Sequence, residues 1–306
     1  MFSSMPFFIY LYPNFLYMGK KGLTQSISDF CNSLASLAKV CILSRGASLS
    51  SSEGRGREII IIGNGPSFSA TLAAESDWLL AHDLMCVNFA ALTPEFLRLR
   101  PRYYILADAH FFNAAASDPN VGRLWQALKN VSWDMTLLIP SKFKHLATPL
   151  LMDAGNIHLR YFNLTPVEGL KWFSHFLFSA GLGMPRPRNV LIPAIMEAIR
   201  LGFQKIYLCG ADHSWTKTLD VDKENFVVSI QPHFYQDNEE EHRRVRQTYK
   251  GLRLHDVLGS MTIAFKSYWD IADYARKKKI EIINATPSSM IDAFPRKERM
   301  SPANPQ

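Results

Sequence analysis

Short apolar runs alternate with amphipathic helical patterns along most of this 306-residue chain. The runs are almost continuously apolar, which is typical of parallel strands buried on both faces of a sheet. The seven runs lie at 59–63, 84–89, 103–108, 135–140, 157–162, 205–212 and 281–286. Because connections between parallel strands are almost always right-handed, this order predicts an α/β fold with a doubly wound, mainly parallel sheet and helices on both faces.

The helical patterns fall between these runs and help to divide the chain into parts. They cover 67–81, 120–129, 170–180, 189–201 and 262–278. We expect an N-terminal apolar and amphipathic appendage (1–45), a flexible Ser/Gly-rich linker (46–57), a Rossmann-like domain that carries the site (58–294) and a disordered tail (295–306).

The chain carries a net charge of +7, and its basic residues are dispersed. Such a charge suits an anionic ligand, a membrane surface or nucleic acid. No nucleic-acid recognition motif accompanies it, so we expect no nucleic-acid partner. The four cysteines lack the CxxC spacing of a zinc site. They favour a reduced, cytoplasmic protein with neither disulfides nor a structural metal.

The N-terminal region has two interpretations that the residues leave open. The segment from Met5 to Met18 is apolar but too short and interrupted to cross a membrane. Phe30, Leu34 and Leu37 then follow at helical spacing. This helix could pack on the main domain, or it could anchor the protein peripherally at the inner membrane.

The first apolar run leads into the sequence GNGPS at residues 63–67, where a helical pattern begins. A glycine turn between a strand and a helix N-terminus is a common phosphate site. Phe68 stands where a dinucleotide fingerprint needs its third glycine, and no P-loop lysine follows. The turn therefore favours a different phosphate compound, with Asn64 and Ser67 as polar contacts. A tight turn capped by Ser67 would explain the same residues.

Polar side chains also follow three other runs. They are Asn88, Asp108 and, in the sequence GADHSW, Asp212 with His213. Because the carboxyl ends of parallel strands meet at one edge of a sheet, we expect these residues to line a ligand crevice.

A further segment offers acids and histidines for chemistry. Asp220 and Asp222 form a DxD pattern of the kind that holds Mg²⁺ or Mn²⁺ in many sugar-nucleotide transferases, although solvated loop acids are the simpler interpretation. His213, His233 and His255 all lie in the C-terminal half, and an imidazole that titrates near neutral pH can act as a general base.

Taken together, three motifs resemble the bacterial sialyltransferases of glycosyltransferase family 42. They are "IIIIGNGPS" at 59–67, "IMEAIRLGFQKIYLCGADHS" at 195–214 and "INATPSS" at 283–289. The GNGPS turn is also similar to that of the motility accessory factor and 6-hydroxymethylpterin pyrophosphokinase group. The resemblance covers about 58–294 and leaves out the N-terminal appendage.

The resemblance implies an inverting transfer of a sialic-type sugar from a CMP-activated donor to a surface glycan or lipid-linked glycan, without a metal or other cofactor. It implies that His255, with His233 as the second candidate, is the general base, and Asp212 is counted among the catalytic residues. The implied nucleotide and donor contacts are Gly63, Asn64, Gly65, Pro66, Ser67, Asn88, Asp108, Arg188, Gly210 and His213.

One departure from the family pattern concerns the segment before the helix at 189–201. Arg186 or Arg188 could replace the family's arginine, but the Thr-Ser hydroxyls are missing. Three other functions therefore stay open. They are a Mg²⁺-dependent pyrophosphokinase that uses Asp108 and Asp212, a metal-dependent UDP- or GDP-sugar transferase that uses Asp220 and Asp222, and a non-catalytic binding module.

Overall fold

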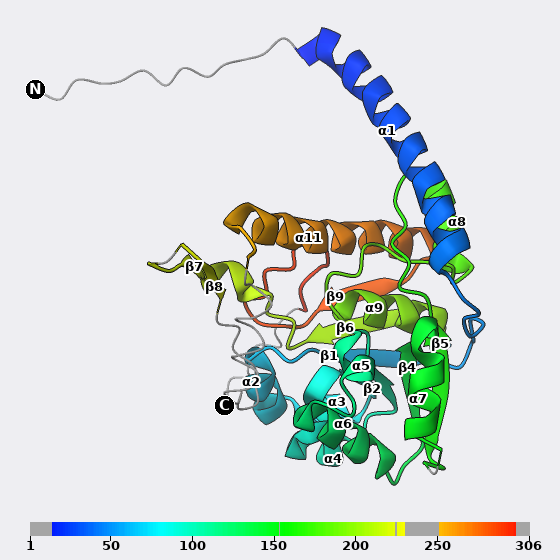
Figure 1. Ribbon diagram of the computed structural model, residues 1–306, viewed down its shortest axis with the longest axis vertical. Coiled ribbons are helices and arrows are strands. Elements are labelled where there is room, and N and C mark those ends of the chain that lie inside the picture. The colour runs from blue at the N-terminus through cyan, green and yellow to red at the C-terminus, as the bar shows by residue number, and fades with distance from the viewer. Residues whose placement is uncertain (1–13, 153, 224, 230–250, 298–306) are drawn as a thin grey trace, which may run out of the picture.

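The computed structural model describes the chain except for residues 1–13, 153, 224, 230–250 and 298–306 (Figure 1). Seven strands form one sheet in the order β5-β4-β3-β2-β1-β6-β9, and every neighbouring pair is parallel. They are β1 Glu58–Ile62, β2 Asp83–Val87, β3 Tyr103–Ile105, β4 Met135–Pro140, β5 Ile157–Phe162, β6 Lys205–Cys209 and β9 Glu281–Asn284. The seven predicted strands and the α/β class are confirmed.

Helices cover both faces of the sheet, as a doubly wound fold requires (Figure 1). The helices are α1 Asn14–Leu43, α2 Ser67–Ala74, α3 Ser76–Leu80, α4 Pro94–Leu99, α5 His110–Asn113, α6 Pro119–Lys129, α7 Lys144–Leu150, α8 Lys171–Ser179, α9 Leu191–Arg200 and α11 Leu254–Lys277. The predicted helix at 67–81 is divided at Glu75, where the backbone leaves the helical region.

The isoleucines of β1 show how the sheet separates two apolar layers. Ile59 and Ile61 face a core that includes residues of α8, α9 and α11. Ile60 and Ile62 face the opposite core, which includes residues of α2, α4 and α6. Successive strand residues point to opposite faces, so a run that is apolar throughout is buried on both sides.

The chain order reverses at β1, which lies between β2 and β6. Strands β2 to β5 extend the sheet on one side of β1, while β6 and β9 extend it on the other. In open α/β sheets, ligands bind outside the carboxyl ends of the strands at such a reversal point. In this chain the loops that begin at Gly63 and Gly210 meet there.

The segment between α1 and β1 was expected to be a flexible linker, but much of it is hydrogen-bonded to the domain. Ser48 donates its N–H to the carbonyl of Tyr161 at 2.8 Å, and Gly54 donates to Leu201 at 2.9 Å. Arg200, which forms a buried ion pair with Glu197, also donates to the Ser48 carbonyl. These partners come from β5 and from the end of α9, so composition alone does not indicate them.

Two further differences concern the C-terminal part. Helix α11 begins at Leu254, eight residues before the predicted start at residue 262, so His255 lies in its first turn. The tail expected to be disordered from residue 295 pairs with β9 at its beginning. Asn284 donates to the carbonyl of Pro295 at 2.8 Å, and Lys297 donates to Asn284 at 3.2 Å.

Candidate active site

The loops after β1 and β6 are joined by hydrogen bonds at the carboxyl edge of the sheet. Gly63 donates its N–H to the Cys209 carbonyl at 2.7 Å, and Gly65 donates to the Gly210 carbonyl at 2.8 Å. A Cβ atom at Gly65 would overlap Oδ2 of Asp212, which explains why this close approach requires glycine. Gly210 itself has a φ of 62°, a conformation that glycine adopts without strain.

This arrangement changes the role expected of the glycine turn. The N–H of Gly65 is already paired with Gly210, so it is not available to a phosphate. Ser67 does not cap α2 with its side chain; Pro66 is the N-cap residue, and Ser67 Oγ donates to Oδ2 of Asp212 at 2.7 Å. The turn therefore holds Asp212 in place. Asn64 is the polar side chain of this turn that lines the cleft described next.

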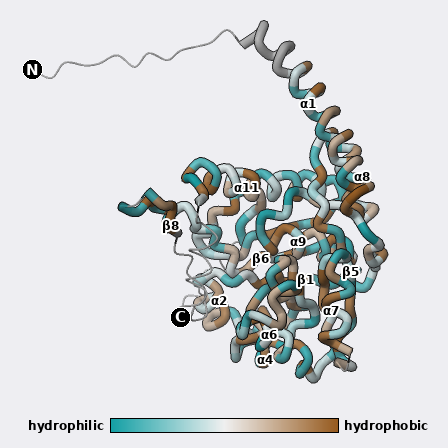
Figure 2. The backbone as a smooth tube through the Cα atoms, in the orientation of Figure 1, coloured by the Kyte–Doolittle hydropathy of each residue, from teal (hydrophilic) through white to brown (hydrophobic). Residues whose placement is uncertain are grey.

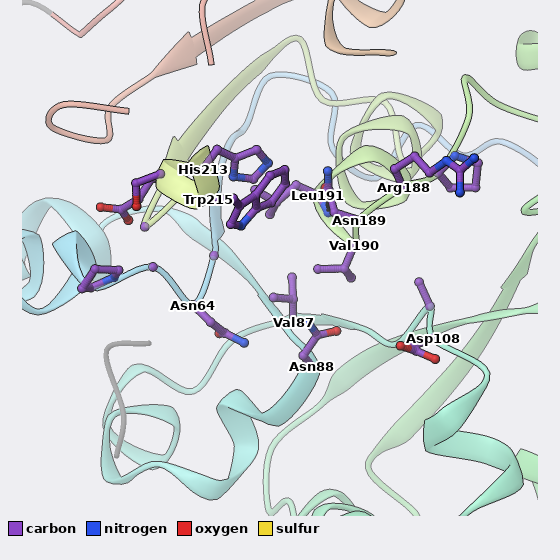
Figure 3. A pocket seen from close by; sticks show the side chains of 18 of the residues that line it. Asn64, Val87, Asn88, Asp108, Arg188, Asn189, Val190, Leu191, His213 and Trp215 are labelled. Carbon is purple, nitrogen blue, oxygen red and sulfur yellow. Dashed lines mark hydrogen bonds between the residues drawn. The ribbon is translucent and has the colours of Figure 1, made fainter. Parts of the chain in front are cut away.

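A cleft of about 460 Å³ opens at this edge of the sheet (Figure 3). Its volume is in the ordinary range for a small-molecule site. Figure 3 shows Asn64 and Asn88 on one side of the open space and Asn189, His213 and Trp215 on the other. The lining residues are Gly63, Asn64, Gly65, Pro66, Val87, Asn88, Ala107, Asp108, Leu164, Pro187, Arg188, Asn189, Val190, Leu191, Gly210, Asp212, His213, Ser214, Trp215 and Thr218.

Two residues that line the cleft have left-handed backbone conformations, which residues other than glycine seldom adopt. Asn88 has a φ of 53° and His213 a φ of 52°. The hydroxyl of Tyr104, in β3, donates to the Asn88 carbonyl and holds this turn. Such conformations cost about 1–3 kcal/mol each and concentrate at functional sites. Asn88 directly follows β2, His213 lies in the loop after β6, and both line the cleft.

Two amide groups of the cleft are buried without a hydrogen-bond partner among the described residues. They are Oδ1 of Asn64 and Nδ2 of Asn189. An unpaired buried polar atom costs about 1–3 kcal/mol, so such atoms are normally satisfied by protein, water or ligand. One acceptor and one donor are thus left for a bound molecule.

Three charged side chains line the cleft, namely the cation Arg188 and the acids Asp108 and Asp212. Arg188 lies at the cleft beside the N-terminus of α9, and within the described part of the chain no acid forms an ion pair with it. Arg186 is not equivalent, because its Nε is paired with Oε2 of Glu168 at 2.6 Å. Asp108 accepts the N–H of His110 at 2.9 Å.

His213 is held in a buried aromatic setting. Its Nε2 lies 2.6 Å from the hydroxyl of Tyr268, in α11. The centroids of the His213 and Trp215 rings are 4.1 Å apart. Burial lowers the pKa of His213 to about 3, because the charged imidazolium would lose its hydration. The ring is therefore neutral at physiological pH, and so low a pKa makes it a weak base, which suits a hydrogen-bonding role better than proton abstraction.

Most of the predicted site residues meet in this cleft, but the histidine predicted as the base does not. Of the predicted nucleotide and donor contacts, all except Ser67 line it, and Ser67 reaches it through Asp212. The side chain of His255 is 82% exposed, lies 3.4 Å from Asp256 and is outside the cleft lining. Its role as general base stays a prediction, and His233 lies outside the described residues.

The DxD acids lie in a separate hairpin, β7 Leu219–Val221 and β8 Val227–Ser229. Asp222 accepts the N–H of Phe226 at 2.8 Å, which closes the turn, and neither acid lines the cleft. Across the described part of the chain, no group of three or more His, Cys, Asp or Glu residues could hold a metal ion.

Three residues were absent from the predicted site, two that line the cleft and one that lies behind it. Asn189 reads as a helix start in the sequence, and it does accept the N–H of Leu191 at 3.0 Å. Tyr268 reads as a core residue of α11, and only the fold shows that its hydroxyl reaches His213. Trp215 directly follows the GADHS motif, so its position was the one available signal.

Comparison with solved structures gives three matching chains. No family model matches the chain, and no curated protein matches it. A solved structure, that of a MAf glycosyltransferase from Magnetospirillum magneticum AMB-1, is 13% identical with a TM-score of 0.47. The match covers 85% of this chain and 37% of the Magnetospirillum chain. Similarity at this level is no evidence of a shared activity.

Proposed function

We propose that the protein is a glycosyltransferase that uses a nucleotide-sugar donor. The observation that carries the proposal is the cleft at the reversal point of the sheet, where a cation, two acids and unpaired amides surround about 460 Å³. A donor of this kind has an anionic phosphate, hydroxyl-rich rings and a base, and it needs these complementary groups. The resemblance to the family 42 enzymes supports the same class.

The phosphate would lie against Arg188 and the N-terminus of α9. The helix dipole favours an anion there, and the guanidinium adds a full positive charge. One arginine and one helix end suit a monophosphate, so a CMP-type donor is favoured over a UDP- or GDP-type donor. As the phosphate leaves, these groups stabilise its developing charge.

A carboxylate of the cleft is the better placed general base. Asp108 and Asp212 both line the cleft, whereas His255 points to solvent on α11. The carboxylate would take the proton from the acceptor hydroxyl as that oxygen attacks the anomeric carbon. The nucleotide phosphate would leave from the opposite side, so the configuration would invert in one displacement. Ser67 would keep Asp212 in position.

Helix α1 would bring the enzyme to its lipid-linked acceptor. It projects from the domain (Figure 1), and one face exposes Leu23, Ile27, Phe30, Leu34 and Leu37. The part Gly22–Leu43 is long and apolar enough to cross a membrane, judged by length and composition alone. Figure 2 shows apolar and polar residues alternating along this helix, and the exposed apolar residues recur every three or four positions, which places them on one face as in an interfacial helix. Sedimentation with anionic lipid vesicles, lost in a Leu34→Ser/Leu37→Ser variant, would support this role, while a shift to dimers in solution would point instead to a second copy.

A thermal-shift panel tests the proposed donor. CMP and CMP-sialic acid should raise the melting temperature without Mg²⁺, and UDP- and GDP-sugars should raise it less. Stabilisation by ATP only in the presence of Mg²⁺ would favour the pyrophosphokinase. Stabilisation by no nucleotide would leave the non-catalytic binding module.

A further inference from the structure

A chain of hydrogen bonds runs from the N-terminus of α9 to the ring of His213. Asn189 Oδ1 accepts the N–H of Leu191 at 3.0 Å and the hydroxyl of Tyr268 at 2.9 Å. The same Tyr268 oxygen lies 2.6 Å from Nε2 of His213. All four residues are brought together by the fold, since α9, the loop after β6 and α11 are distant in sequence.

The direction of each bond in this chain follows from the chemistry of the groups. The backbone N–H of Leu191 can only donate, so the Asn189 atom that faces it is the carbonyl oxygen. The Tyr268 hydroxyl has one hydrogen, which it gives to that oxygen, and it must then accept from His213. Neutral His213 therefore carries its hydrogen on Nε2 and has a lone pair on Nδ1.

That lone pair belongs to a ring that lines the cleft. Within the part of the chain that the structure describes, Nδ1 of His213 has no hydrogen-bond partner. The Trp215 ring lies against the imidazole at an interplanar angle of 30°, so the ring cannot turn freely (Figure 3). The Nδ2 of Asn189, the other end of the same chain, is an unpaired donor.

We propose that His213 and Asn189 together recognise two neighbouring hydroxyl groups of a sugar, with Tyr268 as the residue that positions both. A ligand hydroxyl would donate to Nδ1 of His213, and a ligand oxygen would accept from Nδ2 of Asn189. Vicinal hydroxyls supply one donor and one acceptor in this way. This inference rests on the proposed nucleotide-sugar function, and the two hydroxyl groups belong either to the ribose or to the transferred sugar.

The hydrogen position can be tested without any ligand. Nitrogen-15 NMR of histidine-labelled protein should show His213 as the neutral Nε2–H form at pH 7. Tyr268→Phe removes the acceptor and should abolish that preference. Tyr274→Phe is the matched control, because the Tyr274 hydroxyl is also on α11 and buried but is bonded to Ser179 at 2.9 Å, away from the cleft. A Nδ1–H form in the unchanged protein would overturn the inference.

Calorimetry then shows whether His213 and Asn189 recognise the ribose or the transferred sugar. The probes are CMP, its 2′,3′-dideoxy analogue and CMP-sialic acid, and the variants are Tyr268→Phe and His213→Asn, since Asn tolerates the left-handed backbone. If the ribose is recognised, the variants should bind CMP about 3–10-fold more weakly and lose its preference over the dideoxy analogue. If the donor sugar is recognised, only the added affinity of CMP-sialic acid over CMP should fall.

Two results would overturn the proposal, and they differ in what they say about the function. If wild-type protein binds the probes and both variants bind them equally well, His213 does not read hydroxyl groups although the nucleotide function stands. If wild-type protein binds none of the probes, the CMP-type function fails as well. In that case an Nε2–H form seen by NMR would show that the chain of bonds serves only to hold α11 against the loop.

Discussion

Ser67 donates its hydroxyl hydrogen to Oδ2 of Asp212 at 2.7 Å, which joins the loop after β1 to the loop after β6. The two residues are far apart in the sequence, and the parallel pairing of β1 with β6 brings them together. The bond fixes one carboxylate oxygen of Asp212 and leaves the other for a ligand. Several testable consequences depend on this joined pair of loops and on the groups around it.

The close approach of the two loops predicts that Gly65→Ala is strongly destabilising. The new methyl group would overlap Asp212 and the Gly210 carbonyl, so the loops would have to separate. We expect a loss of about 2–4 kcal/mol in the free energy of unfolding, measured by urea denaturation. Gly155→Ala is the control, since no atom lies within 4 Å of its added Cβ. Equal stability of the two variants would show that the loops are not joined in solution.

Arg188 is predicted to anchor the phosphate of the donor. Removing its charge with Arg188→Ala should weaken CMP binding about tenfold or more and reduce the salt dependence of binding. The free energy of unfolding should hardly change, because no ion pair to Arg188 is found among the described residues. Arg55→Ala, at an exposed position outside the cleft, should leave both measurements as they were. Unchanged affinity in Arg188→Ala would place the phosphate elsewhere.

The choice between a carboxylate and a histidine as general base can be made by kinetics. Asp108→Asn and Asp212→Asn keep the size of each side chain but remove the base, and kcat should fall about 10²–10⁴-fold in the variant that lacks it. His255→Ala should keep near-normal kcat, because its side chain is 82% exposed and outside the cleft lining. A large loss of kcat in His255→Ala alone would restore the histidine as base.

The partly buried carboxyl of Asp270, in α11, should make the free energy of unfolding depend on pH. Burial raises the pKa of its carboxyl from 3.8 to about 6, despite the nearby Lys266. The folded state therefore holds the Asp270 proton more tightly than the unfolded state, so the contribution of this carboxyl to stability is full below about pH 4 and is lost as the pH rises through about 6. Asp270→Asn should raise the free energy of unfolding at pH 7.5 by about 1–3 kcal/mol and change little at pH 4.

Asp273 is the matched control for this experiment, because it lies on the same helix with the opposite shift. The hydrogen bond from Lys171 lowers the pKa of Asp273 and outweighs its partial burial. Its stabilising effect is present above the unfolded pKa and disappears as the pH falls, so Asp273→Asn should not stabilise the protein at pH 7.5. Equal effects of the two substitutions across the pH range would contradict the assignment.

The sheet could be predicted from the sequence because its signal is local. The Ile59–Ile62 run is apolar throughout and is buried on both faces, and the runs of β2, β3 and β6 show the same pattern. Asn88, Asp108 and Asp212 could be placed in one cleft because parallel strands end at a common edge. The local pattern was enough for the sheet, and the topology of a parallel sheet was enough for the placement of these three residues.

The rest depends on contacts between distant segments, which leave no local pattern. Gly65 looks like a phosphate-binding glycine, but its N–H is taken by a carbonyl of the loop after β6. Ser48 looks like part of a linker, but β5 supplies it with a partner. His255 looks like a loop histidine, and the earlier start of α11 is what turns it to solvent.

The central claim is that the cleft binds a cytidine monophosphate sugar without a metal, and a calorimetric titration tests it most directly. CMP should bind in the presence of EDTA, and Asn64→Ala and Arg188→Ala should both weaken that binding. Binding of ATP that requires Mg²⁺, together with no binding of CMP or CMP-sialic acid, would contradict the claim.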